Sequence, residues 1–313
     1  MAEKVVCVTG PTGCGKTTLS ILLAERLHGE VVSADSMQIY RGMTIGSAAP
    51  APEETHGIPH HMIAVADPAE SWSVARYVRE AVPVVDNILS RGNLPVLTGG
   101  TGLWLDSLVR GRAFAPGENG GEIRRELEKR LESGGMVPLW EELERVDPET
   151  AARLHPADVK RVLRALEVYY ESGQTISSHN ARTRDLPPRY NAVWLGLRFR
   201  DREDMRTQLD RRVEQMVKAG LLDEVRALVN RVPPDATALQ AIGYKELVPV
   251  VRGECSLQEG LDAVKIHTHQ FAKRQLTWFR RNPAIHWIEW EHERDFSRAV
   301  QISTEILMTC GVC

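Results

Sequence analysis

The sequence predicts an α/β fold, in which helices flank a parallel sheet and a helical domain is inserted into the chain. Three observations support this prediction. A short apolar run at residues 4–9 leads through a glycine-rich turn into a helical pattern. Two further apolar runs, at 30–34 and 94–97, also end in polar or glycine-rich corners. A charged helical block then separates these runs from an apolar run at 192–197, and such alternation of strands and helices is typical of parallel sheets.

Composition narrows the class of protein. The 313 residues are 42% hydrophobic and 26% charged, which is typical of a globular chain. Five cysteines without framework spacing favour a reducing compartment, and no apolar stretch approaches the length of a membrane span, so a cytoplasmic protein is expected. A net charge of −3 argues against a globally basic nucleic-acid binder, and any such affinity must come from local patches.

The strongest motif follows the first apolar run, Lys4–Thr9. It reads Gly10-Pro11-Thr12-Gly13-Cys14-Gly15-Lys16-Thr17 and fits G-x-x-x-x-G-K-[ST] in full. Its glycines let successive backbone N–H groups surround an anion, and the start of the next helix adds its dipole. Lys16 supplies a charge to the phosphates and Thr17 can hold Mg²⁺. The helix is expected to stop at Gly29. We therefore predict a P-loop NTPase-like sheet that binds a nucleotide or a pyrophosphate group, although the motif does not name the reaction.

The second and third strands bring candidate groups to the same edge of the sheet. The strand Glu30–Ala34 is followed by Asp35, which could be a Mg²⁺ ligand, a general base or a helix cap. The strand Leu94–Leu97 is followed by Thr98 and glycines, and a helical run begins at Leu103. Many P-loop proteins carry an Asp for the metal after this strand. Its absence weakens an ordinary ATPase interpretation and leaves Asp35 as the obvious carboxylate.

Taken in order, several segments of the chain resemble the tRNA dimethylallyltransferases, also called tRNA isopentenyltransferases. The P-loop alone is common to many families, but the ordered set covers nearly the whole chain and is highly specific. The matching segments are Gly10–Thr17, Asp35–Met43, Ile45–Pro50, Pro59–Met62, Gly99–Gly102, His155–Val168, Gln240–Lys245 and Gln270–Arg281.

The resemblance implies an activity and a set of site residues. A dimethylallyl group would pass from dimethylallyl diphosphate to N6 of adenosine 37 in tRNA, with release of pyrophosphate and with Mg²⁺ as cofactor. Lys16 and Arg212 would bind the diphosphate, Asp35 would be the general base, and Thr101 would orient the reacting groups. Ser36, Met37 and Gln38, beside Asp35 and Thr101, would line the channel that receives the flipped base.

Four positions depart from the pattern of that family. Ser47 and Ala49 stand where the family usually has Thr and Lys, Trp104 replaces a Tyr, and Gln208 stands where an Arg is common. None of them belongs to the proposed core chemistry. The departures concern contacts with the substrates.

Composition and the resemblance together predict the domain organisation. Residues 111–121 are rich in Gly and Pro and are interpreted as a linker, and the pattern from Glu122 to about Gly173 is helical. We predict a core domain of residues 1–114 and 194–313 and a helical insertion of residues 115–193. In the family such an insertion contacts the anticodon stem-loop. Later, 205–228 is expected to be a long helix broken at Gly220, and the remaining segments are expected to be mostly helical.

Two basic clusters are predicted to meet RNA phosphates. One lies in the insertion (Arg153, Lys160, Arg161, Arg164), where the resemblance assigns tRNA contacts to Val159, Lys160, Arg161, Val162, Leu163 and Arg164. The other lies late in the chain (Lys265, Lys273, Arg274, Arg280, Arg281), with His267, His269 and Trp278. The pair His60-His61 is expected to be structural, because adjacent side chains on a strand point apart. A monomer acting on tRNA, without a membrane partner, is expected.

Three alternative functions remain open from the residues themselves. A P-loop small-molecule kinase would bind ATP at 10–17 and use Asp35 to activate a hydroxyl group. An adenylate isopentenyltransferase would share the donor but act on a free nucleotide, and the helical insertion favours tRNA over it. A non-catalytic RNA-binding switch would bind a nucleotide without transferring an alkyl group.

Overall fold

The structure is a computed structural model that describes residues 3–112, 114, 121–184 and 186–312. These residues form two compact units, Arg112–Pro187 and the remainder of the chain. The predicted insertion, 115–193, therefore ends too late, because the fifth strand already begins at Asn191. It also begins slightly late, at 115 instead of 112. Most of the predicted linker, residues 113 and 115–120, lies outside the described residues.

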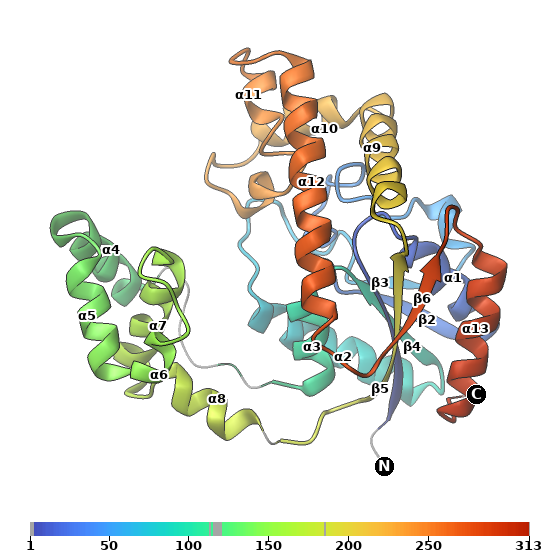
Figure 1. Cartoon of the computed structure of the whole chain (residues 1–313), viewed down its shortest axis with the longest axis horizontal. Helices are drawn as coiled ribbons and strands as arrows, with labels where there is room; N and C mark the ends of the chain where they lie inside the picture. Colours follow the sequence, from blue (N-terminus) through green and yellow to red (C-terminus); the bar gives the residue numbers. More distant parts are fainter. Residues whose placement is uncertain (1–2, 113, 115–120, 185, 313) are drawn as a thin grey trace. The chain divides into compact units, whose positions relative to one another are not determined.

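The larger unit is built on one parallel sheet (Figure 1). Its strands are β1 (Lys4–Thr9), β2 (Gly29–Ser33), β3 (His60–His61), β4 (Leu94–Gly99), β5 (Asn191–Phe199) and β6 (Ile285–Trp290), in the order β3-β2-β4-β1-β5-β6. β1 lies between β4 and β5, so the loop that follows it leaves the middle of the sheet edge. This is the position at which parallel sheets bind ligands.

Helices cover both faces of this sheet (Figure 1). α1 (Lys16–Arg26) and α13 (Phe296–Thr309) pack together over one face, and α2 (Val74–Ser90) and α3 (Gly102–Arg110) pack over the other. Leu19 and Leu23 of α1 and Leu307 of α13 are fully buried against Val6 and Val8 of β1. The predicted α/β fold with a parallel sheet flanked by helices is confirmed.

The helices after β5 also follow the predicted pattern. α9 (Arg202–Lys218) and α10 (Leu221–Val229) are separated at Gly220, whose φ of 103° favours glycine. The short η2 (Thr237–Gln240) and α11 (Val248–Val251) lead to α12 (Leu257–Phe279), which begins with a capping box of Ser256 and Glu259. α12 packs against α9 and α3.

Two details of the predicted elements were wrong. α1 ends at Arg26 and Gly29 is the first residue of β2, where a Cβ atom would lie 2.7 Å from the carbonyl oxygen of Leu94. β6 was not predicted, because the late segments were expected to be mostly helical and this edge strand, interrupted by His286 and Glu289, carries no continuous apolar run. Its pairing with β5 is a contact distant in sequence.

The smaller unit consists of helices only. They are α4 (Glu122–Gly134), α5 (Val137–Val146), α6 (Pro148–Ala151), α7 (Val159–Ser172) and α8 (Ile176–Arg184). Leu127, Leu143 and Leu166, from three different helices, are at most 1% exposed and belong to the core of the unit. The buried Asp147 accepts hydrogen bonds from the backbone N–H groups of Thr150 and Ser177, which joins α6 to α8.

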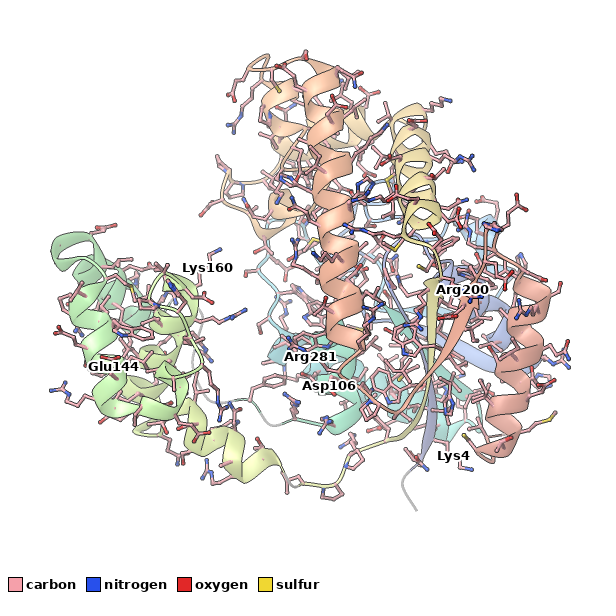
Figure 2. All side chains as sticks on the ribbon, viewed as in Figure 1. Lys4, Asp106, Glu144, Lys160, Arg200 and Arg281 are labelled. Carbon is pink, nitrogen blue, oxygen red and sulfur yellow. The ribbon has the colours of Figure 1, made fainter. Side chains whose placement is uncertain are left out.

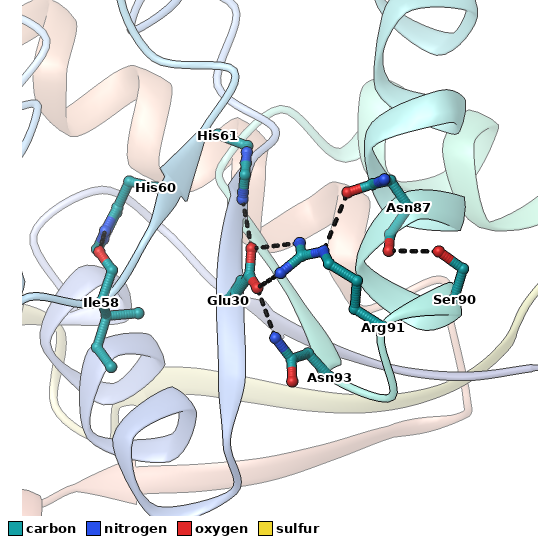
Figure 3. Close-up of polar contacts among 8 residues, drawn as sticks. All are labelled: Glu30, Ile58, His60, His61, Asn87, Ser90, Arg91 and Asn93. Carbon is teal, nitrogen blue, oxygen red and sulfur yellow. Dashed lines mark hydrogen bonds and ion pairs between the residues drawn. The ribbon is translucent and has the colours of Figure 1, made fainter.

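A buried carboxylate on β2 forms a network of hydrogen bonds with residues from neighbouring segments (Figure 3). Glu30, on β2, is 3% exposed and accepts hydrogen bonds from both terminal nitrogens of Arg91 at 2.5 and 2.9 Å. His61 and Asn93 contact the same carboxylate at 2.8 and 2.7 Å, while His60 bonds to the carbonyl oxygen of Ile58. The two histidine side chains serve different partners, which agrees with the structural role predicted for them.

This network predicts a measurable contribution to stability. The hydrogen bonds from Arg91 hold the pKa of Glu30 at about 2, below its ordinary value, so the stabilisation is present above about pH 4.5 and is lost as pH falls toward 2. Glu30→Gln should lower the free energy of unfolding by about 2 kcal/mol at pH 7, because buried donors lose a charged acceptor. Urea unfolding between pH 7 and 3 should show the difference from wild type narrowing with acid.

Glu80→Gln is the matched control for that experiment. It removes an exposed carboxylate on α2 that lies 3.5 Å from Arg79, and exposed ion pairs contribute little. Equal effects of the two substitutions at pH 7 would contradict the role of the Glu30 network.

Candidate active site

The P-loop joins β1 to α1 at the centre of the sheet edge. Gly10, Gly13 and Gly15 have φ values of 138°, 78° and 84°, which lie in the left-handed region that favours glycine. At Gly10 a Cβ atom would lie 2.2 Å from the carbonyl oxygen of Leu197 on β5. The loop can therefore curl its amides around an anion only because these positions carry no side chain.

Lys16, the first residue of α1, is prepared for an anionic ligand. Its Nζ donates to the carbonyl oxygen of Pro11 in the same loop at 2.8 Å. Burial lowers the pKa of Lys16 to about 8, against the opposing effect of the negative charge of Asp35. A desolvated ammonium group of this kind gains strongly from a phosphate partner.

Asp35 follows β2 and is half-buried beside the P-loop. Its Oδ1 accepts a hydrogen bond from the backbone N–H of Met37 at 2.9 Å, which closes a turn and does not cap a helix. The charge of Asp35 acts on both Lys16 and Arg212. The structure thus brings together three of the predicted catalytic residues, which lie far apart in the sequence.

Thr101 is the fourth predicted catalytic residue, and it bonds to the turn of Asp35. Its Oγ1 accepts from the backbone N–H of Ser36 at 3.2 Å and donates to the Ser36 hydroxyl at 3.3 Å. The hydroxyl therefore joins the start of α3 to the turn that follows β2. Thr101 is placed to position Asp35 through this turn.

The P-loop is also held from α12, by a residue that sequence reasoning did not single out. Gln275 is 6% exposed; its Oε1 accepts from the backbone N–H of Thr12 at 2.8 Å, and its Nε2 donates to the carbonyl oxygen of Gly100 at 2.9 Å. One amide thus joins the P-loop to the turn before Thr101. In the sequence, the one indication of a role for Gln275 was its position within the segment 270–281, which resembles the family.

The P-loop, Asp35 and Gln275 line a cavity of about 900 Å³. Lys16 and Asp35 lie on its polar side with the arginines Arg211, Arg212 and Arg294. Aliphatic and aromatic side chains of α1, α9 and α12 line other parts of it: Ile21, Leu22, Met216 and Phe271. The cavity combines a site for phosphate groups with an apolar surface, which suits a ligand that carries both.

The positive charges that line this cavity interact with one another and with Asp35. Burial lowers the pKa of Arg212, and the charge of Asp35 opposes that shift. Arg294, which was not predicted, lies in the loop between β6 and α13, and its guanidinium is 3.5 Å from the carbonyl oxygen of Gly13. Together with Lys16 these residues can neutralise a diphosphate.

Residues from the C-terminal part of the chain also contact the P-loop. The indole Nε1 of Trp290 donates to the carbonyl oxygen of Cys14 at 2.9 Å. Phe296 packs edge-on against Trp290, with ring centroids 5.4 Å apart, and a Cβ atom at Gly15 would lie 2.7 Å from its ring. These contacts come from β6 and α13, whose role the local sequence did not indicate.

Among the residues predicted to line the base channel, Gln38 has a second contact that the sequence did not indicate. It does line the cavity, but its Oε1 accepts from the hydroxyl of Ser33 at 2.8 Å and its Nε2 donates to the carbonyl oxygen of Ala48 at 3.1 Å. Its amide therefore joins the end of β2 to the 44–51 segment. Ser36 and Met37 are half-buried in the turn of Asp35.

The late basic cluster divides into two groups. Lys265, His267 and His269 face carboxylates (Glu214, Glu246 and Asp210) at 2.7, 2.6 and 2.8 Å, so their charges already have partners within the chain. Lys273, Arg274, Arg280 and Arg281 are exposed, and within the described ranges none forms an ion pair. Figure 2 shows Arg281 just beyond the end of α12.

The predicted tRNA contacts of the helical unit are partly corrected. Val162 and Leu163 are at most 1% exposed and belong to its core, so their side chains cannot meet RNA. Val159 is half-buried. Lys160 and Arg161 are exposed on α7, with Lys160 labelled in Figure 2, while Arg161 pairs with Asp158 and Arg164 with Glu167.

The structure shows where the four residues that depart from the family pattern lie. Ser47, Ala49 and Gln208 line the cavity, so these differences change its wall. Trp104, on α3, is 5% exposed and stacks on Tyr77 of α2, with ring centroids 4.2 Å apart. The exchange at Trp104 therefore concerns packing.

Comparison with known proteins assigns the whole chain to one group. The family model "IPP transferase" matches residues 38–282, and the model "Isopentenyl transferase" matches residues 3–66. Two curated tRNA dimethylallyltransferases are similar: that of Pelotomaculum thermopropionicum is 40% identical over 96% of this chain and 95% of the relative, and that of Geobacter sulfurreducens is 44% identical over 92% of each.

Solved structures agree with these sequence matches. A tRNA isopentenylpyrophosphate transferase from Bacillus halodurans is 38% identical and covers 99% of each chain, with a TM-score of 0.72. A eukaryotic dimethylallyltransferase acting on tRNA is 29% identical, with a TM-score of 0.84 over 98% of this chain and 80% of the other.

Proposed function

Because the chain belongs to the IPP transferase family, we propose that it transfers a dimethylallyl group from dimethylallyl diphosphate to N6 of adenosine 37 in tRNA, releasing pyrophosphate. The observation that carries this proposal is the cavity beside the P-loop. Lys16, Arg212 and Arg294 provide charge for a diphosphate, and apolar side chains line the same cavity for an allylic chain. Asp35 lies at its edge, where a proton must be removed.

The first event is loss of the leaving group. As the allylic C–O bond breaks, its electron pair passes to the diphosphate, and negative charge develops on the bridging oxygen. Donors that are already fixed around this position stabilise the transition state without reorganisation. The P-loop amides, Lys16 and Arg212 supply that stabilisation, and Gln275 keeps the loop in place through Thr12.

The second event forms the new bond. The N6 amine attacks the allylic carbon, becomes acidic as its nitrogen gains a fourth bond, and releases a proton to the carboxylate of Asp35. One oxygen of Asp35 is engaged by Met37, and the turn is fixed by Thr101. The target base reaches this position only when it leaves the stack of the tRNA loop.

The residues present also fit a Mg²⁺ ion. Thr17 and Asp35 line the same cavity next to the diphosphate site, and Mg²⁺ is commonly held by one or two protein oxygens together with substrate phosphates. Among the described residues no group of three or more His, Cys, Asp or Glu side chains forms a protein-only metal site. Bound there by Thr17, Mg²⁺ would neutralise charge on the diphosphate.

We further propose a cytoplasmic monomer. Within the described chain, no helix has both the length and the apolar character needed to cross a bilayer. Cys7, Cys14, Cys255 and Cys310 are all free thiols, which suits a reducing compartment. Light scattering of the purified protein would test the monomeric state.

The activity is tested by incubating the protein with unmodified tRNA, Mg²⁺ and dimethylallyl diphosphate, and by reading the digested RNA with nucleoside mass spectrometry. We expect isopentenyl-adenosine only when the allylic donor is present. A parallel reaction with AMP as acceptor tests the adenylate enzyme, and one with ATP as donor tests a kinase. Modification of AMP but not of tRNA would overturn the proposal.

The exposed cations of α12 predict how tRNA binding depends on salt. Replacing Lys273 and Arg281 with Gln should weaken tRNA binding about tenfold, and should lower the slope of log K against log salt by about 0.7–0.9 for each lost phosphate contact. The measurement is a filter-binding titration between 50 and 300 mM KCl. Arg298→Gln, an exposed arginine on α13, is the control and should leave the slope unchanged. An unchanged slope in the double variant would remove α12 from the RNA surface.

A further inference from the structure

One wall of the donor cavity is a segment that has no helix or strand of its own. Thr44, Ile45 and residues 47–51 all line the cavity, but the backbone from 44 to 51 forms only turns and irregular structure. Contacts with other parts of the chain must therefore determine where this wall lies.

The start of the wall is held by one carboxylate from α10. Glu224 Oε2 accepts the backbone N–H groups of Thr44 and Ile45 at 2.8 and 2.9 Å, and Oε1 accepts that of Gly46 at 2.9 Å. Three successive amides that point at one ionised group form an anion-binding nest. Hydrogen bonds to a charged acceptor are stronger than those between neutral groups.

Tyr244 completes this arrangement from a third segment. Its hydroxyl donates to Glu224 Oε1 at 2.6 Å, and its ring is fully buried against the segment. A Cβ atom at Gly46 would lie 2.4 Å from the ring, so the chain can approach Tyr244 only with glycine at that position. Burial raises the pKa of Tyr244, so its hydroxyl keeps the proton that it donates.

The middle of the wall is tied to the turn that carries Asp35. Gln38 Nε2 donates to the carbonyl oxygens of Ala48 and Ser47 at 3.1 and 3.4 Å. Gln38 lies three residues after Asp35, whose carboxylate closes the same turn through Met37. The wall is thus held at its start by Glu224 on α10 and at its middle by the turn of Asp35.

We propose that Glu224 and Tyr244 form a latch that sets the position of the 44–51 wall and thereby the affinity for the allylic diphosphate. The inference rests on the proposed function and adds positioning residues to it. Neither side chain lines the cavity, so both act through the backbone that they hold. The latch controls donor binding, while the bond-making groups, Asp35 and Lys16, keep their own supports from Thr101 and Pro11.

The test is Glu224→Gln, which keeps the size of the side chain but turns an NH₂ donor toward backbone N–H groups. We expect the KM for dimethylallyl diphosphate to rise about tenfold, which is the scale of one charge-assisted hydrogen bond. The kcat should change less than threefold and the KM for tRNA less than twofold, on the same scale. Asp223→Asn is the matched control: it removes the preceding carboxylate, which is 81% exposed and pairs with Arg226.

Each outcome of this experiment either supports or overturns the proposed latch. A rise in donor KM alone supports the latch, while an unchanged donor KM, or a fall confined to kcat, overturns it. If Glu224→Gln does not fold, Tyr244→Phe removes a single hydrogen bond; a donor KM raised about threefold supports the latch, and an unchanged one refutes it. If the wild-type protein itself makes no isopentenyl-adenosine, the proposed function fails, and direct titration of the diphosphate by calorimetry still tests the latch.

Discussion

Asp35→Asn is expected to lower kcat for transfer by about three orders of magnitude, within the range that general-base groups contribute. The substitution is close to isosteric. Its amide oxygen can still accept the hydrogen bond of the Met37 N–H, which now forms at 2.9 Å, so the turn should persist. What disappears is the carboxylate that, in the proposed mechanism, takes the proton from N6 as the nitrogen attacks.

The measurement is a single-turnover reaction with saturating donor and tRNA, followed by nucleoside mass spectrometry and a separate tRNA-binding titration. Binding of tRNA should change less than about twofold, since the positive surface on α12 is untouched. Retained activity would remove Asp35 from the chemistry, and lost tRNA binding would make it a recognition residue. If high Mg²⁺ restores the rate, Asp35 acts as a metal ligand and not as the base.

Lys16→Met is expected to lower kcat/KM for the donor by about 10²–10³, the loss seen when one preorganised donor is removed from a site of developing charge. The effect should be large because Lys16 is held beside the P-loop carbonyl of Pro11 at 2.8 Å, in a desolvated position. Methionine fills a similar volume but carries no charge. The loss should therefore reflect stabilisation of the leaving group.

The pH dependence of the same reaction provides an independent check. The pKa of Lys16 is lowered to about 8, so its charged fraction in the free enzyme falls as pH rises through that value. The kcat/KM for the donor, which reports the free enzyme, should bend downward near pH 8. Lys16→Arg keeps its charge over this range and should abolish the bend even if its rate is lower. A bend that persists in the Met variant would belong to another group.

Much of the site could be predicted from local sequence. The P-loop at 10–17 requires only a buried strand, positive-φ glycines and a helix start, all of which depend on neighbouring residues. The strands β1, β2, β4 and β5 consist mainly of buried apolar residues, and their runs were recognised within a few residues of the observed bounds. Lys16, Asp35 and Thr101 follow such strands, and the shared edge of a parallel sheet brings their loops together.

Other features depend on tertiary contacts. β6 becomes a strand by pairing with β5. Gln275 contacts Thr12 of the P-loop, although the two residues are 263 positions apart in the sequence. Val162 and Leu163 looked like part of an RNA-binding segment, but α4 and α5 bury that face of α7. A helical pattern shows which side chains share a face and does not show which partner covers it.

By itself, the sequence determined the parallel α/β core and the phosphate-binding loop, and it predicted the candidate residues that the structure places beside that loop. The tertiary structure decided which cations remain free on α12, why Gln38 holds a loop, and how Glu224 and Tyr244 fix the wall of the cavity. The physical reason is the range of the interactions. Backbone conformation and burial patterns arise among neighbours in the chain, whereas Glu224 meets Thr44 across 180 residues and only the folded chain makes that contact.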